Sequence, residues 1–209
     1  MTPNRAAVTA VGYVGLAALA AAPKLTSPEL DLARLYIEQT RNGVIGATRG
    51  LSLAQWNFKP APDRWSIAEI VEHIVVTQEL VLGPLRDQLA KAPPPPAREN
   101  KQVDAIIINQ FPDRTIKVKA PEVVQPAGRW SPEVAMERLI ANYTRLAEYL
   151  ETTPDLRQHA IDAPPLKIIT NGEYEKMDGY QWILAAAAHA ERHTKQILEV
   201  KADPDFPSK

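Results

Sequence analysis

Apolar residues recur at helical spacing in four segments of the chain, separated by stretches rich in proline and polar residues. In residues 132–153 they return every three or four positions, as on one face of an amphipathic helix. Residues 28–49, 67–92 and 179–201 are also read as helices, whereas the alternation typical of strands is almost absent. Four helices with little strand pattern predict an all-α fold, a four-helix bundle.

Capping residues mark the start of each predicted helix. Ser66 and Glu69 have the spacing of a capping box, in which each side chain binds the other residue's backbone amide. Trp65, just before this cap, is expected to pack on Ile70, and Pro84 is expected to kink the same helix. The other expected caps are Ser27 before Pro28, Ser131 before Pro132, and Asp178 with Gln181, and the expected ends are Gly50, the prolines at 93–96, Pro154 and Lys201.

A long insert, residues 92–130, separates the second and third predicted helices. Its segment 101–111 predicts a short helix, and residues 115–120 alternate like a short extended piece. Two roles stay open for the insert, a flap over a functional site or padding of the bundle. We find no repeat and no second domain, so residues 28–207 are assigned to one domain.

The first 22 residues have the layout of a secretory signal peptide. Arg5 precedes an uncharged run of 17 residues from Ala6 to Ala22, which is short for a membrane span. Ala18 and Ala20 favour cleavage after Ala20. We therefore expect a secreted or periplasmic protein with no stable membrane span after processing. An uncleaved anchor, or an alanine-rich helix of a cytoplasmic protein, is the alternative.

The net charge and the amino-acid composition limit the partners and the kinds of site that the protein can have. The net charge of −1 creates no strong field toward nucleic acid, so we expect no nucleic-acid partner. The chain has no cysteine, which excludes disulfides, thiolate metal sites and a cysteine nucleophile. A metal site would have to use histidine, carboxylate and water as ligands.

Two of the four histidines, His189 and His193, lie four residues apart in the alanine-rich last helix. At about 100° per residue, both fall on the apolar stripe that faces the bundle interior. Buried imidazoles need partners for their nitrogens, and one metal ion would serve both rings. Hydrogen-bonded core histidines are the alternative interpretation. His73 in the second helix is the candidate third ligand, whereas His159, in a proline-rich connection, is expected at the surface.

The segments "GLSLAQWNFKPAPDRWSIAEIVEHI" and "YQWILAAAAHAERHTKQILEVKADPDFP" resemble the DinB-like superfamily, which includes the YfiT-like metal-dependent hydrolases. The resemblance covers roughly residues 30–207, and its most specific parts are the Trp-Ser helix start followed by histidine and the late His-x-x-x-His. It implies an up-down-down-up bundle, consistent with the long insert. It also implies that His73, His189 and His193 bind a divalent ion, Zn, Ni or Fe. One departure is Lys195, where many relatives carry a small residue.

The resemblance leaves two kinds of chemistry open. Some relatives are transferases or isomerases that use a low-molecular-weight thiol such as mycothiol or bacillithiol, and a metal would favour the thiolate. Others are suspected hydrolases, which need a metal-bound water and a general base. Glu69 and Glu72 are the carboxylates nearest His73 in sequence. Neither is placed to act as a base, because Glu69 serves the cap and Glu72 faces elsewhere by helical phase.

No catalytic residue is therefore assigned from the sequence. Export argues against a thiol cofactor that belongs to the cytoplasm. A third hypothesis is a non-catalytic metal-binding protein with a stress-associated or interaction role. We expect a small-molecule substrate of unknown structure, and a homodimer is one assembly that we keep open.

Overall fold

The computed structural model of the protein describes residues 24–208, and the expected signal peptide at residues 1–22 lies outside this range. Within it, no helix combines the length and the apolar character needed to cross a membrane. The helices and strands are α1 (Ser27–Thr48), α2 (Leu53–Asn57), α3 (Ile67–Leu80), η1 (Val81–Leu85), α4 (Arg86–Leu89), α5 (Asn100–Gln110), η2 (Glu122–Val124), α6 (Pro132–Thr152), β1 (Ala160–Asp162), α7 (Pro164–Ile169), β2 (Lys176–Asp178) and α8 (Gly179–Lys201).

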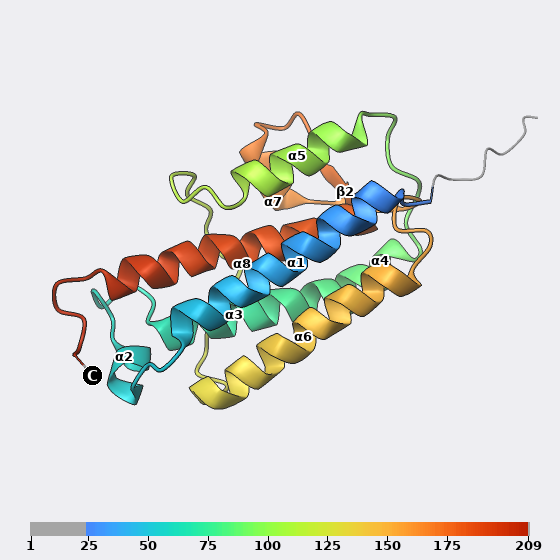
Figure 1. Ribbon diagram of the computed structural model, residues 1–209. Coiled ribbons are helices and arrows are strands. Elements are labelled where there is room, and N and C mark those ends of the chain that lie inside the picture. Colours follow the sequence, from blue (N-terminus) through green and yellow to red (C-terminus); the bar gives the residue numbers. More distant parts are fainter. Residues whose placement is uncertain (1–23, 209) are drawn as a thin grey trace, which may run out of the picture.

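The four long helices follow the up-down-down-up order. α3 and α6 run parallel to each other and antiparallel to α1, and α8 returns in the direction of α1 (Figure 1). The four helices form one bundle, in which α1 contacts α6 and α8, and α3 contacts the same two helices. The predicted four-helix bundle is confirmed, and it makes neighbours of the two helices that carry the candidate ligands.

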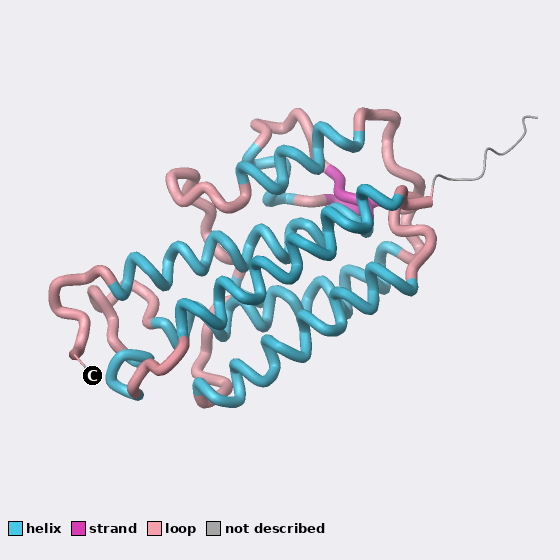
Figure 2. Tube along the Cα trace, viewed as in Figure 1, coloured by secondary structure: helices cyan, strands magenta, loops and turns pink. Residues whose placement is uncertain are grey.

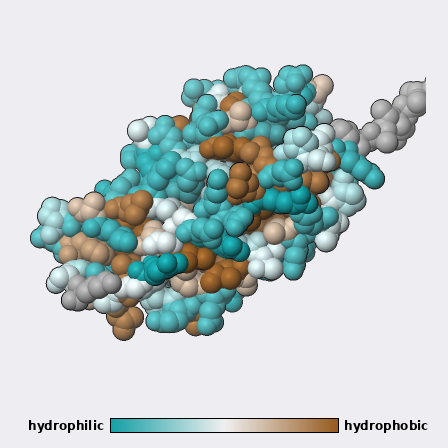
Figure 3. All heavy atoms as spheres, in the orientation of Figure 1, coloured by the Kyte–Doolittle hydropathy of each residue, from teal (hydrophilic) through white to brown (hydrophobic). Residues whose placement is uncertain are grey.

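One apolar core fills the space between these helices. α8 is buried along most of its length because α1, α3 and α5 all pack on it. Polar residues cover much of the outer face, and the apolar residues visible there form separate patches (Figure 3). The largest fully buried side chains are Tyr143, Tyr180, Ile67, Ile70, Ile74, Leu82, Ile107, Leu139, Leu146, Leu150, Leu166 and Met177.

The starts of α3 and α8 are confirmed. The Glu69 amide donates to the Ser66 hydroxyl at 3.2 Å, and the Ser66 amide donates to the Glu69 carboxylate at 2.7 Å. Asp178 and Gln181 form the same reciprocal pair at the start of α8. Because capping satisfies amides that have no partner inside the helix, these two boxes fix where both histidine-bearing helices begin.

The predicted start of α1 is wrong by one residue. Thr26 is the cap rather than Ser27, because Glu29 lies three residues after Thr26 and its carboxylate accepts the Thr26 amide at 2.7 Å. Ser131 caps α6 as expected, and its hydroxyl accepts the Val134 amide at 3.4 Å.

The insert contains the predicted short helix as α5, which packs on α8. The predicted extended piece at 115–120 forms no strand in the described part of the chain. The alternating pattern alone does not make a ladder, since a strand needs a neighbouring edge to bond with. After α5 the chain crosses as a long loop to the start of α6 (Figure 2). This crossover allows α3 and α6 to run in the same direction.

Several short elements were not predicted from the sequence, because they contain too few residues for a periodic pattern. β1 and β2 form an antiparallel pair with α7 between them, and α2 follows α1.

Pro84 lies within η1, a π-helical turn, where the ring interrupts the α-helical ladder. The helix then resumes as α4 and ends at Leu89, before the prolines at 93–96.

A buried ion cluster around Arg157 joins the connection between α6 and β1 to the helices of the bundle. The Arg157 guanidinium donates to Asp178 at 2.9 Å, to Asp104 of α5 at 2.6 Å and to Glu29 of α1 at 2.7 Å. Its carbon lies 4.2 Å from the centre of the Tyr180 ring. The side chains of Arg157 and Asp178 are 3% and 0% exposed, so their charges depend on each other rather than on water. One arginine therefore joins α1, α5 and the cap of α8.

Candidate metal centre

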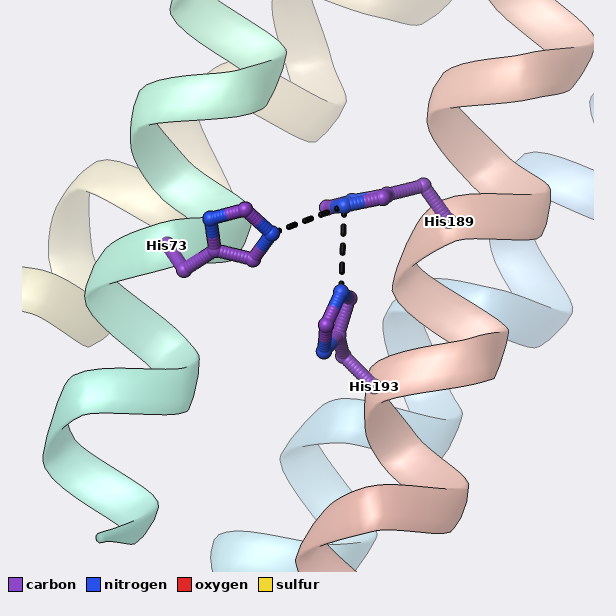
Figure 4. A group of neighbouring side chains, drawn as sticks. All are labelled: His73, His189 and His193. Carbon is purple, nitrogen blue, oxygen red and sulfur yellow. Dashed lines mark hydrogen bonds between the residues drawn. The ribbon is translucent and has the colours of Figure 1, made fainter. Parts of the chain in front are cut away.

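The three histidines singled out from the sequence meet in space. His73 extends from α3, and His189 and His193 extend from successive turns of α8 (Figure 4). The Nε2 atom of His189 lies 3.0 Å from Nε2 of His73 and 3.1 Å from Nε2 of His193. The structure therefore brings together the predicted residues, while their role as metal ligands stays a prediction.

Helix geometry explains the convergence. Residues four apart lie one turn apart on the same face, so both α8 rings point toward α3. The indole of Trp65, just before the cap of α3, packs beside them, with its ring centre 4.8 Å from that of His73 and 6.3 Å from that of His193. The capping box thus places an aromatic side chain against the histidines as well as starting the helix.

Hydrogen bonds fix the tautomers of two of the rings. Nδ1 of His73 donates to the backbone oxygen of Val124 at 2.6 Å, and Nδ1 of His193 donates to Oε1 of Gln196 at 2.8 Å. A carbonyl oxygen only accepts, so Nδ1 carries the proton and Nε2 keeps a free lone pair. Both lone pairs face Nε2 of His189. The Nδ1 atom of His189 is buried without a hydrogen-bond partner in the described structure.

Burial keeps the cluster neutral. It is the main cause that lowers the pKa of His73, and it holds the pKa of both His189 and His193 well below the usual value. For His189 the neighbouring histidines act in the same direction, because like charges repel. Neutral imidazoles are the form that binds metal ions.

The donor set fits a divalent ion. Three nitrogens bound to one tetrahedral zinc at about 2.0–2.1 Å lie about 3.3 Å apart, close to the two observed distances. All three candidate atoms lie within 4.8 Å of one another, and in the part of the chain described no carboxylate completes the group. Three protein ligands with room for a fourth are typical of catalytic metal sites rather than structural ones.

The carboxylates near His73 in sequence are occupied elsewhere. The carboxylate of Glu69 belongs to the capping box and also accepts a hydrogen bond from Nζ of Lys59 at 2.9 Å. Glu72 accepts the amides of Ala127 and Gly128 at 2.8 and 3.0 Å. Burial alone would raise the pKa of Glu72, but the hydrogen bonds from the Ala127 amide and from Arg129, together with the charge of Arg129, hold it below its usual value. The expectation that neither carboxylate faces the histidines is consistent with these contacts.

His159 lies outside the cluster, but it is not the surface residue that we expected. Its side chain is half-buried, and Nδ1 donates to the backbone oxygen of Ala92 at 2.5 Å. The proline-rich connection is held against the end of α4 at this point, which covers the ring.

Lys195, where many relatives carry a small residue, pairs with Glu191 at 2.9 Å, and both residues lie on α8.

The sequence left two roles open for the insert, a flap over the site or padding of the bundle, and it did not indicate which residues of the insert lie near the histidines. Besides Val124, its residue Arg114 binds both Gln196 and Glu199 of α8, and Arg192 of α8 donates to the backbone oxygens of residues 113 and 116. The insert therefore contacts α3 and α8 at the residues next to the histidines. No local pattern in the sequence announces a backbone carbonyl as a partner, so this contact required the fold.

The fold and the site define a four-helix-bundle protein with a three-histidine cluster between its helices. The chain belongs to the DinB superfamily, whose family model matches residues 36–197. It is 23% identical over 153 residues to the uncharacterized protein YuaE of Bacillus subtilis, covering 73% of this chain and 87% of YuaE. The structure of YfiT from Bacillus subtilis aligns with a TM-score of 0.54 at 14% identity, covering 85% of this chain and 88% of YfiT. That protein is described as a probable metal-dependent hydrolase with an unusual four-helix bundle topology.

Proposed function

We propose that the protein binds one divalent metal ion through Nε2 of His73, His189 and His193 and acts as a metal-dependent hydrolase. The observation that carries this proposal is the convergence of three neutral imidazole nitrogens without a fourth protein ligand among the described residues. When bound, a divalent ion would lower the pKa of a water or thiol in its open position. The description of YfiT as a probable metal-dependent hydrolase supports the choice of reaction class.

The chain's own residues supply the positioning. Val124 and Gln196 hold the Nδ1 protons of two rings, so their Nε2 atoms stay free for the ion. Trp65 restricts the ring of His73 by packing beside it. Fixed ligands of this kind reduce the reorganisation that metal binding and catalysis require.

A thiol-dependent transferase is the second candidate. It is favoured by one observation: within residues 24–208 no carboxylate joins the histidine cluster to serve as a general base. A thiol bound by the metal is activated by loss of its own proton and needs no such base nearby. A non-catalytic metal-binding role is the third candidate.

We expect protein purified without a histidine tag to carry about one divalent ion per chain and to hydrolyse members of a small ester and amide panel. The measurement is elemental analysis followed by the panel, with thiol conjugates alongside, each with and without chelator. Chelator-sensitive ester or amide hydrolysis supports the hydrolase, and turnover of thiol conjugates alone supports the transferase. Metal binding with no turnover in either panel would favour a non-catalytic role.

We also propose that the protein is exported. Arg5, the uncharged run from Ala6 to Ala22 and the small residues Ala18 and Ala20 support cleavage after Ala20. Mature protein isolated from the native host is expected to lack roughly the first 20 residues. Intact-mass measurement tests this, and a soluble cytoplasmic protein that begins at Met1 or Thr2 would contradict it.

A further inference from the structure

The carboxylate of Glu72 organises the last part of the insert. It accepts three successive backbone amides, from Ala127 at 2.8 Å, Gly128 at 3.0 Å and Arg129 at 3.2 Å. The guanidinium of Arg129 also donates to it at 2.5 Å. The side chain of Glu72 is only 5% exposed, so this carboxylate is committed to the loop. Four donors on one buried carboxylate make an anchor rather than a free acid or base.

The same loop delivers the partner of His73. Val124 ends the short helix η2 and is buried, and its backbone oxygen accepts from His73 Nδ1. Arg129, held by Glu72, donates in turn to the backbone oxygen of Gln125 at 3.0 Å. Gly128 adopts a φ of 68°, a left-handed conformation that glycine enters without strain. Val124 and the anchor therefore belong to one closed turn.

Two adjacent residues of α3 thus bind the two ends of this turn: His73 binds Val124, and Glu72 binds residues 127–129. Glu72 and His73 point in directions about 100° apart, so the turn has to wrap around the helix to reach both. If the anchor were lost, the Val124 oxygen would have no fixed position and the imidazole of His73 would be free to adopt its other tautomer. In that tautomer Nε2 carries the proton, and it cannot donate a lone pair to a metal ion.

We infer that Glu72 is a positioning residue for the metal site. It fixes the turn of residues 124–129 so that the Val124 carbonyl locks His73 in the tautomer with its Nε2 lone pair directed at His189. The inference rests on the proposed metal binding for its functional consequence. Its structural part concerns the metal-free protein and stands on the hydrogen bonds alone.

The test is Glu72→Gln in the full chain. Glutamine keeps the size of the side chain and one accepting oxygen, but its NH₂ group cannot accept the amides and guanidinium that the second oxygen holds. The matched control is Glu79→Gln. Glu79 lies on the same helix and pairs with Arg138 at 2.6 Å, and among the described residues no hydrogen bond joins its side chain to the insert or to the histidines.

Two readouts are combined. The ring nitrogen chemical shifts of His73 in the metal-free protein report the tautomer, and Zn²⁺ titration against a competing chelator reports affinity. In Glu72→Gln we expect the Nε2-protonated tautomer to appear and the Zn²⁺ dissociation constant to rise about 10–100-fold, the usual cost of losing an outer partner of a ligand. In Glu79→Gln both readouts should match the wild type.

A folded Glu72→Gln protein with the wild-type tautomer of His73 would overturn the inference. If that variant does not fold, Arg129→Ala replaces it, since it removes one donor from the anchor and leaves the carboxylate in place. It should shift both readouts in the same direction by a smaller amount, and unchanged readouts would again overturn the inference. If the wild type binds no Zn²⁺, the proposed function fails, while the tautomer still decides whether Glu72 positions His73.

Discussion

Replacing His73 or His193 with alanine is expected to remove stoichiometric metal from the purified protein. Each variant deletes one of the three candidate ligand nitrogens found in the described structure, so the dissociation constant should rise by more than the 10–100-fold typical of losing an outer hydrogen-bond partner. The measurement is metal content per chain after desalting, followed by a Zn²⁺ titration of the apo protein. His189→Ala should behave in the same way, since its Nε2 lies between the other two.

His159→Ala is the control for these variants, because it removes an imidazole that lies outside the cluster. It should retain the wild-type metal content. If His73→Ala and His193→Ala also retain it, the three histidines are not the ligands. They would then be core histidines hydrogen-bonded to one another and to Val124 and Gln196.

The same site should make the protein sensitive to acid. Burial lowers the pKa of all three rings in the folded state, whereas in the unfolded chain they titrate near the usual value of about 6.5. Below about pH 6.5 the unfolded state therefore binds more protons than the folded state, and the free energy of unfolding falls as pH drops through this window. Metal affinity should hold at neutral pH and decline in the same acidic range.

Arg157→Met is expected to lower the free energy of unfolding by about 3–5 kcal/mol at neutral pH, as for other buried pairs that lose one partner. Methionine occupies similar space but leaves the carboxylates of Asp104 and Asp178 buried without their shared cation. Burial already raises the pKa of Asp178, and Arg157 opposes that rise in the native protein. Urea unfolding of the apo protein measures the loss.

The pH dependence of this loss identifies its cause. Without Arg157 the folded-state pKa of Asp178 should rise further above its unfolded value, because burial raises it and Arg157 no longer opposes the rise. The penalty should then shrink on acidification, as this carboxylate takes up a proton. Arg34→Met is the control, because Arg34 also pairs with carboxylates but its side chain is 48% exposed. An equal loss in both variants, or a loss independent of pH, would contradict the role given to the buried cluster.

Periodicity and capping were sufficient to predict the bundle. Ser66 with Glu69 and Asp178 with Gln181 are local signals, since both partners lie within one helical turn. The pairing of His189 with His193 is local for the same reason. His73 was the candidate third ligand because it lies in another predicted helix, and the family resemblance supported that choice. Only the fold brings it within 3.0 Å of His189.

The unpredicted parts rest on contacts between distant residues. Arg157 had no visible partner in the sequence, because Asp104 lies 53 residues before it. Val124 acts through its backbone oxygen, and no side-chain pattern encodes that contact. The short strands β1 and β2 are stabilised by each other and by the bundle. Each has three residues, which is too few for a periodic pattern to be visible in the sequence.

The crossover topology also determines when the site can form. His73 and His189 are separated by 116 residues, and α8, which supplies two of the three imidazoles, is the last of the described helices. Closing so long a loop is entropically costly before the native contacts repay it. A chain in which α8 has not docked therefore lacks the complete three-histidine cluster, and the proposed metal uptake should follow the docking of α8. In refolding experiments the rate of metal capture would then report the final step of folding, and the captured ion would slow its reversal.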